Sequence, residues 1–195
     1  MALRRKKAEF KPDSAARNLP QRFYISPQQQ RRYLKWILFS LLCLALLVLQ
    51  DVLFSRLSLY GATVDMVPCA LMMICVLQGA EGGSVFLLVS ALVYYLSGSA
   101  PGVYVILLIP LMGTLAAAFR QGYLRKGFRT TLMCAGMAVV LYEACVFLLG
   151  LLLGMTIFAR WYVITLTAGL SVLTLPLIFP LIQGIAKIGG DSWKE

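Results

Sequence analysis

The sequence predicts an all-α fold, a polytopic membrane bundle of about six transmembrane helices. Of its 195 residues, 60% are hydrophobic and only 13% are charged, and the mean hydropathy is +0.81. These values lie far from the averages of soluble domains. The apolar residues also form blocks of roughly membrane-spanning length, separated by short stretches that hold nearly all the glycine, proline and charge.

Residues 1–33 are expected to form a basic cytoplasmic tail without stable structure, because they are polar and contain Pro12, Pro20 and Pro27. The chain has a net charge of +10, and ten of its eighteen Lys and Arg residues lie before the first apolar block. Such clusters also bind nucleic acid. Their position beside a hydrophobic helix instead favours a topology signal that binds anionic lipid head groups. We therefore expect membrane lipid, and no nucleic acid, as a partner.

The six expected helices cover residues 34–54, 60–77, 82–97, 103–119, 130–156 and 161–182, within a transmembrane domain of residues 34–183. The second and third contain apolar runs shorter than a bilayer crossing, so each is extended into its mixed flanking residues. A stretch rich in Gly, Ser and Pro at residues 97–102 separates the third helix from the fourth. Residues 184–195 are expected to be a short cytoplasmic tail.

The distribution of positive charge predicts that both termini are cytoplasmic. The loop after the fourth helix carries four positive charges, at Arg120, Arg125, Lys126 and Arg129. With six crossings, sixteen of the eighteen Lys and Arg residues lie on the inner side, and only Arg56 and Arg160 lie outside. The alternative is a re-entrant hairpin formed by the second and third segments, with four spanning helices. We favour six crossings.

No catalytic or metal-binding motif is present in the sequence. There is no histidine, which removes the commonest general base and a common metal ligand. The five cysteines all lie in apolar blocks without a CxxC pair, and the nucleotide-binding GxxxxGK[ST], HExxH and GxSxG patterns are missing. We expect a protein that is not an enzyme and binds no cofactor.

The candidate functional residues are the polar side chains in the outer half of the membrane. Glu143 is the foremost, since an intramembrane carboxylate costs at least ~2.5 kcal/mol on insertion scales and normally faces protein or water. Asp51, Asp65 and Tyr94 are expected near the same depth. Two interpretations stay open for these side chains: a site that binds a ligand or partner, and polar contacts that only hold neighbouring helices together.

Two pairs of glycines have the spacing that lets helices approach closely. Gly79 and Gly83 lie at the turn between the second and third helices, and Gly150 and Gly154 are expected in the fifth. Such small-residue pairs favour tight helix packing, either inside the bundle or against a partner helix.

Residues 50–119 resemble the MreD family, small integral membrane proteins of the bacterial rod-shape machinery. The likeness lies in Gln50-Asp51-Val52-Leu53 at the end of the first helix, Leu57-Ser58-Leu59-Tyr60-Gly61 after it, and Val64-Asp65-Met66 at the start of the second. The glycine-rich turn at Gly79 and Gly83, and Leu96-Ser97-Gly98 with Gly102, continue it. Val64 replaces a proline that is usual in the family, and Tyr94 lies near a position where many members have aspartate.

The resemblance implies a non-enzymatic scaffold in the bacterial inner membrane. Such a scaffold binds the single-span protein MreC and links cytoplasmic MreB filaments to the cell-wall synthase complex that makes peptidoglycan. MreD-like folds are also similar to the substrate-binding S components of energy-coupling-factor vitamin transporters. That alternative requires an outward-opening polar pocket, for which Asp65, Tyr94, Tyr95 and Glu143 are the candidates.

Overall fold

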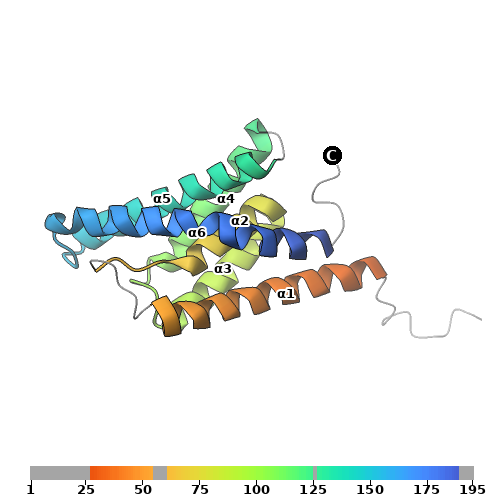
Figure 1. Cartoon of the computed structure of the whole chain (residues 1–195), viewed down its shortest axis with the longest axis horizontal. Helices are drawn as coiled ribbons and strands as arrows, with labels where there is room; N and C mark the ends of the chain where they lie inside the picture. Colours follow the sequence, from red (N-terminus) through yellow and green to blue (C-terminus); the bar gives the residue numbers. More distant parts are fainter. Residues whose placement is uncertain (1–26, 55–60, 125–126, 189–195) are drawn as a thin grey trace, which may run out of the picture.

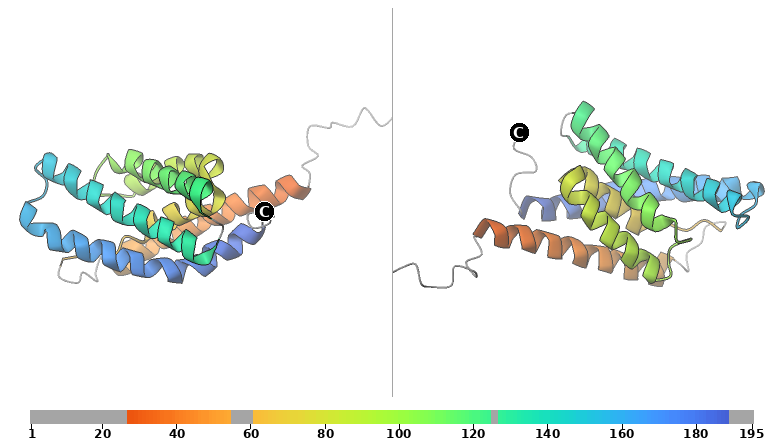
Figure 2. Two further views of the ribbon diagram at one scale, coloured as in Figure 1. Left: turned by 90° about the horizontal axis from the view of Figure 1, so that it is seen from above. Right: turned by 180° about the vertical axis from the view of Figure 1, so that it is seen from behind.

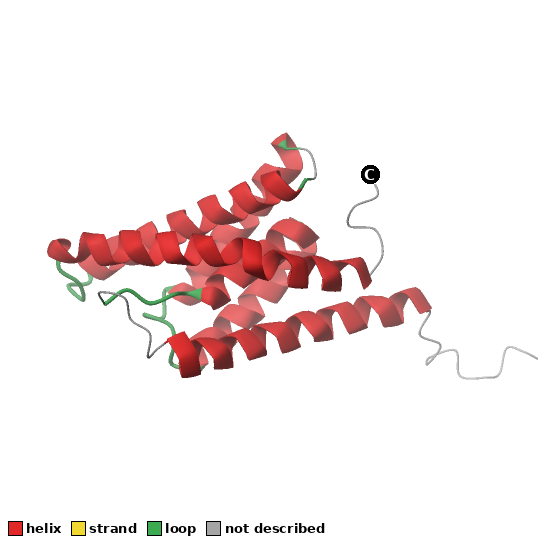
Figure 3. Cartoon of the chain, viewed as in Figure 1, coloured by secondary structure: helices red, strands yellow, loops and turns green. Residues whose placement is uncertain are grey.

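A computed structural model describes residues 27–54, 61–124 and 127–188, and in these ranges the chain forms helices and loops without a strand (Figure 3). The all-α prediction is therefore confirmed. In chain order the elements are α1 (Pro27–Leu49), the π-helical turn η3 (Gln50–Phe54), α2 (Met66–Gln78), α3 (Ala80–Leu96), α4 (Val105–Tyr123), α5 (Phe128–Leu152), the 3-10 turn η4 (Phe158–Arg160) and α6 (Trp161–Ile188).

Four helical stretches are long and apolar enough to cross a membrane: Gln29–Val52, Val105–Tyr123, Phe128–Leu152 and Phe158–Ile188. This finding supports a helical membrane protein. The two remaining apolar helices, α2 and α3, have only 13 and 17 residues. At 1.5 Å per residue, α2 is about 20 Å long, less than the ~30 Å of a bilayer core.

The short helix α2 is the centre of the bundle. Every residue from Val67 to Leu77 is buried, and α2 contacts all five of the other α-helices. Its sequence is apolar on all sides, which is the pattern of a helix surrounded by protein. Because its backbone and side chains meet other helices rather than lipid, α2 does not need the length of a lipid-facing span.

The helices connect alternately at two ends of the bundle (Figures 1 and 2). The first residues of α1, the α4–α5 connection and the last residues of α6 lie at one end, which we call the basic end. Lys35 of α1 donates a hydrogen bond of 2.6 Å to Gln78 at the end of α2, so the α2–α3 turn lies there too. The opposite end, which we call the outer end, holds η3, the α3–α4 loop and the α5–α6 connection.

The α2–α3 turn consists of Gly79 alone. Its φ of 94° lies in the left-handed region that favours glycine. Four residues later, Gly83 packs against Cys75, where an added Cβ would lie 2.9 Å from the Cys75 Cα and 2.7 Å from its Sγ. The absence of a side chain at Gly83 therefore lets the first turn of α3 approach the last turns of α2.

Several helix ends differ from those expected. Helix α1 begins at Pro27, so residues 27–33 are helical rather than part of a tail; proline suits the first helical position because its missing N–H would be unpaired there anyway. Helix α2 begins at Met66 rather than residue 60, α5 ends at Leu152 rather than 156, and α6 extends to Ile188 rather than 182. The rest of the expected tails, residues 1–26 and 189–195, lie outside the described residues.

Candidate functional site

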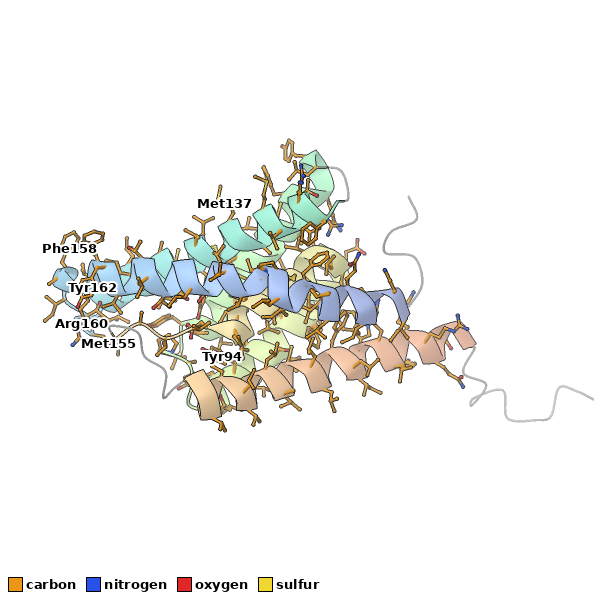
Figure 4. All side chains as sticks on the ribbon, in the orientation of Figure 1. Tyr94, Met137, Met155, Phe158, Arg160 and Tyr162 are labelled. Atoms are coloured by element: carbon orange, nitrogen blue, oxygen red, sulfur yellow. The ribbon has the colours of Figure 1, made fainter. Side chains whose placement is uncertain are left out.

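Four polar side chains from different elements meet at the outer end of the bundle. They are Gln50 of η3, Asp65 in the loop before α2, Tyr94 of α3 and Glu143 of α5. Figure 4 draws Tyr94 near the end of α1, and the Gln50 Nε2 lies 3.4 Å from the Tyr94 hydroxyl. We call these four residues the polar cluster. Three of them, Asp65, Tyr94 and Glu143, were candidates from the sequence.

Gln50 forms hydrogen bonds to two members of the polar cluster, and the sequence analysis named it only in the family likeness, not as a candidate site residue. Its side chain is only 8% exposed. The Nε2 donates to Asp65 Oδ1 at 3.2 Å and to the Tyr94 hydroxyl, while the Oε1 accepts a 3.0 Å hydrogen bond from the backbone N–H of Val67. All the polar atoms of the buried amide thus have partners, which offsets the cost of removing it from water.

The bond from Val67 means that α2 is capped by a side chain from another helix. Asp65 is at the N-cap position, yet its own side chain makes no capping hydrogen bond. Gln50 supplies the acceptor that an N-terminal N–H of α2 needs. The Asp65 carboxyl group is therefore available to other groups of the polar cluster.

Asp65 and Glu143 form a carboxyl pair. Their carboxyl groups lie close enough together to act on each other electrostatically. Asp65 is half-buried, whereas Glu143 is only 4% exposed. The Glu143 Oε1 and the hydroxyl of its neighbour Tyr142 are both buried without a hydrogen-bond partner.

Helix α6 joins the polar cluster through Ser171, a residue that the sequence analysis missed. Its hydroxyl accepts a 3.1 Å hydrogen bond from the backbone N–H of Asp65. Its backbone carbonyl accepts one of 3.4 Å from the Cys69 thiol. The sequence shows only a serine within an apolar segment at this position, and the structure shows that this serine is fully buried.

Asp51 does not belong to the buried polar cluster. It is exposed and accepts a 2.6 Å hydrogen bond from Ser99 of the α3–α4 loop. Ser99 in turn contacts Ser97, whose hydroxyl donates to the Tyr94 carbonyl at 2.7 Å. Asp51 therefore ties the end of α1 to the α3–α4 loop at the surface.

The second glycine pair does not form a helix-packing motif. Helix α5 ends at Leu152, and Gly154 follows it with a φ of 69°. An added Cβ on Gly150 would meet Thr156 of the same connection rather than another helix. The spacing of Gly150 and Gly154 thus reflects the end of α5 and its turn, whereas Gly79 and Gly83 lie at the close α2–α3 contact.

The basic residues expected in one loop differ in their surroundings. Arg120 lies inside α4 and is only 4% exposed, and its Nη1 donates to the backbone carbonyl of Val76 near the end of α2. A positive charge at this position also interacts favourably with the negative, C-terminal end of the α2 helix dipole. Arg129 is exposed in the first turn of α5. Arg125 and Lys126 lie outside the described residues.

Two apolar cavities lie beside α3. One of about 160 Å³ lies between α1 and α3 and is lined by residues that include Ser40, Cys43, Phe86 and Ser90. A second, of about 430 Å³, lies between α3 and α4, where Val85, Leu88 and Leu107 line it with Ser84 and Thr114. Among the described residues, no group of three or more acidic or cysteine side chains is arranged to hold a metal ion.

Comparison of the chain with protein-family models, with curated proteins and with solved structures finds no match.

Proposed function

We propose that this chain is a non-enzymatic scaffold in the inner membrane of a bacterium, with the role that MreD has in the cell-elongation complex. Its helix faces bind an MreC-like partner that has one transmembrane helix. Through that partner it connects the cell-wall synthase complex outside with MreB-like filaments inside. The likeness of residues 50–119 supports this role, and the surface of α3 carries the structural argument.

The proposed topology has six crossings with both termini in the cytoplasm. The described positive charges support it, because Arg31, Arg32, Arg129 and Lys187 belong to the basic end. At the outer end the described residues include one positive charge, Arg160 (Figure 4). An excess of positive charge on the cytoplasmic side is the rule for membrane proteins. In this arrangement α2 and α3 both cross, and the enclosure of α2 by protein allows it to do so with only 13 residues.

Helix α3 offers the surface best suited to a partner helix. It is buried only along a narrow stripe, Gly83, Leu87, Ala91 and Tyr94. The rest of α3 is exposed or half-buried, and an apolar cavity lies on each of its flanks. Ridges of one helix pack into such grooves on another.

Small polar groups in these grooves suit contact between helices in a membrane. Ser90 lines the α1–α3 groove, and Ser84 and Thr114 line the α3–α4 groove. Hydroxyls of this kind hydrogen bond across helix interfaces, and small side chains allow close approach. Ser84 and Thr114 already donate to backbone carbonyls of their own helices, so their hydroxyl oxygens can accept hydrogen bonds from a partner helix that packs along α3 and covers its apolar surface.

Substitution of one leucine on each side of the bundle tests the proposal. Leu88 lines the α3–α4 groove and is 54% exposed, whereas Leu177 lies on the exposed face of α6 and is 72% exposed. We expect Leu88→Trp to reduce copurification of the MreC-like protein at least tenfold and to round a rod-shaped host. Leu177→Trp should leave both unchanged. Normal cell shape after complete depletion of the chain would contradict the proposal.

A transporter S component remains the competing function. It requires a polar pocket open to the outside, but Asp65, Tyr94 and Glu143 contact one another or Gln50. A transporter role predicts a tightly bound vitamin and association with two ATPases. Mass spectrometry of the purified protein distinguishes the two functions, because the scaffold copurifies with cell-wall proteins instead.

A further inference from the structure

The α1–α3 groove is lined by two stripes of side chains that face each other across a cavity of about 160 Å³. The stripes include Ser40, Leu44 and Leu47 of α1, and Phe86, Ser90 and Val93 of α3. In each stripe these residues are four and then three positions apart, so they lie on one face of their helix. The lining is mostly apolar, and protein side chains do not fill the space between the two faces. The groove therefore has room for a ligand from the membrane.

The groove lies at the depth of one membrane leaflet. Half of a bilayer core is about 15 Å thick, which corresponds to about ten residues of a helix. Tryptophan gathers at the interface between membrane and water, and α1 has one tryptophan, Trp36. Counted from Trp36, the leaflet at the basic end reaches about as far as Leu46. The groove, from Ser40 to Leu47 of α1, thus lies at the depth of the acyl chains of this leaflet.

The size of the groove favours an acyl chain as its occupant. A cavity of about 160 Å³ holds less than one turn of an α-helix, which with its side chains is about 10–12 Å wide. A partner helix can therefore lie over the groove but not in it, whereas an acyl chain is a single row of methylene groups. Ser40 donates to the backbone carbonyl of Trp36 at 3.0 Å, so its hydroxyl proton is bonded within α1.

Aromatic rings close the groove toward the basic end. Phe86 lines the groove, and its ring centroid lies 5.2 Å from that of Trp36. Trp36 also packs on the first turn of α3, where an added Cβ on Gly82 would lie 3.5 Å from the indole ring. The indole is thus held between the groove and the membrane surface, at the level of a lipid's glycerol and phosphate groups.

Positive charge lies next to these rings. Arg32 is exposed and precedes Trp36 by one helical turn, on the same face of α1. The Lys35 Nζ lies 5.4 Å from the centre of the Trp36 ring. Its bond to Gln78 uses one of the three N–H donors of the ammonium group. Among the described residues of the basic end, the acidic side chain is Glu81 in the first turn of α3, so the cations outnumber it.

We propose that the α1–α3 groove is a binding site for an anionic phospholipid of the leaflet at the basic end. One acyl chain lies between the stripes of α1 and α3, and the phosphate lies beside Trp36, where Arg32 and Lys35 bind it. Basic sites between transmembrane helices recognise anionic head groups in this way. This site does not depend on the scaffold function, and it lies on the opposite flank of α3 from Leu88.

Native mass spectrometry of the purified full chain tests the site. Dioleoylphosphatidylglycerol and dioleoylphosphatidylcholine are added in equal amounts, so that the two lipids differ only in the head group. A basic residue near the membrane surface strengthens binding of an anionic lipid about fivefold. We therefore expect the unchanged protein to retain the anionic lipid at least about fivefold more than the neutral one. Equal retention of the two lipids would overturn the proposal.

Ser90→Trp tests the place of the acyl chain, because the indole fills the groove. We expect this variant to lose most of the retained anionic lipid. Leu177→Trp, on the exposed face of α6, should keep it. If Ser90→Trp fails to fold, Val89→Trp changes a residue of the same groove that is 54% exposed. A folded groove variant that retains as much anionic lipid as the unchanged protein would overturn the proposal.

Arg32→Gln tests the place of the head group. It should lower the preference for the anionic lipid about fivefold, since one basic residue near the phosphate is lost. Arg129→Gln is the matched control, because Arg129 is also exposed at the basic end but belongs to α5. This control should keep the preference. Equal effects of the two substitutions would overturn the proposal, since the lipid would then respond to the charge of the whole basic end.

Discussion

Gln50 caps helix α2 from a neighbouring helix, since its side-chain oxygen accepts a 3.0 Å hydrogen bond from the backbone N–H of Val67. The same amide donates to Asp65. One side chain thus fixes both the start of the central helix and the position of the carboxyl group beside it. The stability of α2 and the geometry of the polar cluster are therefore coupled.

Gln50→Ala should destabilise the protein by about 1–3 kcal/mol, because it leaves the Val67 N–H and the Asp65 carboxyl without their partners in a buried place. Thermal unfolding in detergent measures the effect. Gln30→Ala is the matched control, since Gln30 is an exposed glutamine of the same helical stretch. Equal melting temperatures for the two variants would show that Gln50 is not a cap.

At position 143 we expect glutamine to be tolerated and lysine to be rejected. Glutamine has nearly the same size as glutamate and carries no charge to bury, so Glu143→Gln should change stability by less than about 1 kcal/mol. Glu143→Lys places an ammonium group in an apolar interior, where a charge is costly. The amount of folded protein in the membrane and its melting temperature measure both effects. Equal tolerance of the two would remove Glu143 from any polar core.

Gly83→Ala should destabilise the α2–α3 contact by about 1–3 kcal/mol, since the new methyl group meets the Cys75 backbone at 2.9 Å. Gly184→Ala is the control. Gly184 also lies within a helix, but an added Cβ there meets no atom within 4 Å. Replacement at that position should be neutral or slightly stabilising, because alanine is the better helix former. Equal changes in stability for the two variants would mean that the close contact of Gly83 with Cys75 contributes nothing measurable.

Arg120→Ala should cost about 1.5–3 kcal/mol, because the Val76 carbonyl loses a charged donor at the end of α2. Arg129→Ala removes the same charge from the same end of the bundle but from an exposed position. The comparison therefore separates a structural role from a role in topology. If both variants unfold at the same temperature as the unchanged protein, the contact of Arg120 with α2 contributes nothing measurable.

Labelling of single cysteines with a membrane-impermeant thiol reagent tests the number of crossings. Glu81 follows the α2–α3 turn and Tyr123 ends α4, whereas Pro101 and Ile157 lie in the loops of the outer end, and all four are exposed. With six crossings, Pro101→Cys and Ile157→Cys react in intact cells. Glu81→Cys and Tyr123→Cys react only after the membrane is opened. Reaction of Tyr123→Cys in intact cells would reverse the proposed topology.

The sequence predicted the helical class because hydrophobic blocks and their Gly- and Pro-rich breaks are local properties. It misplaced the start of α2 because the length rule for a lipid-facing helix was applied to one that contacts protein on every side. The burial of Arg120 was missed for a related reason, since a charge count assigns a side of the membrane but not a depth. No local sequence pattern links Gln50 to Val67 or Ser171 to Asp65, so these contacts can be seen only in the assembled bundle.

The enclosure of α2 also bears on how the protein is made. During synthesis α2 and α3 emerge before the helices that cover the remaining sides of α2, which belong to α4, α5 and α6. Before α4, α5 and α6 are made, the unpaired backbone groups at the ends of α2 have no hydrogen-bond partners in hydrocarbon, and α2 is too short to span the bilayer core. Its final position is thus acquired late in biogenesis, and a chain truncated before α6 should be recognised as incomplete and degraded.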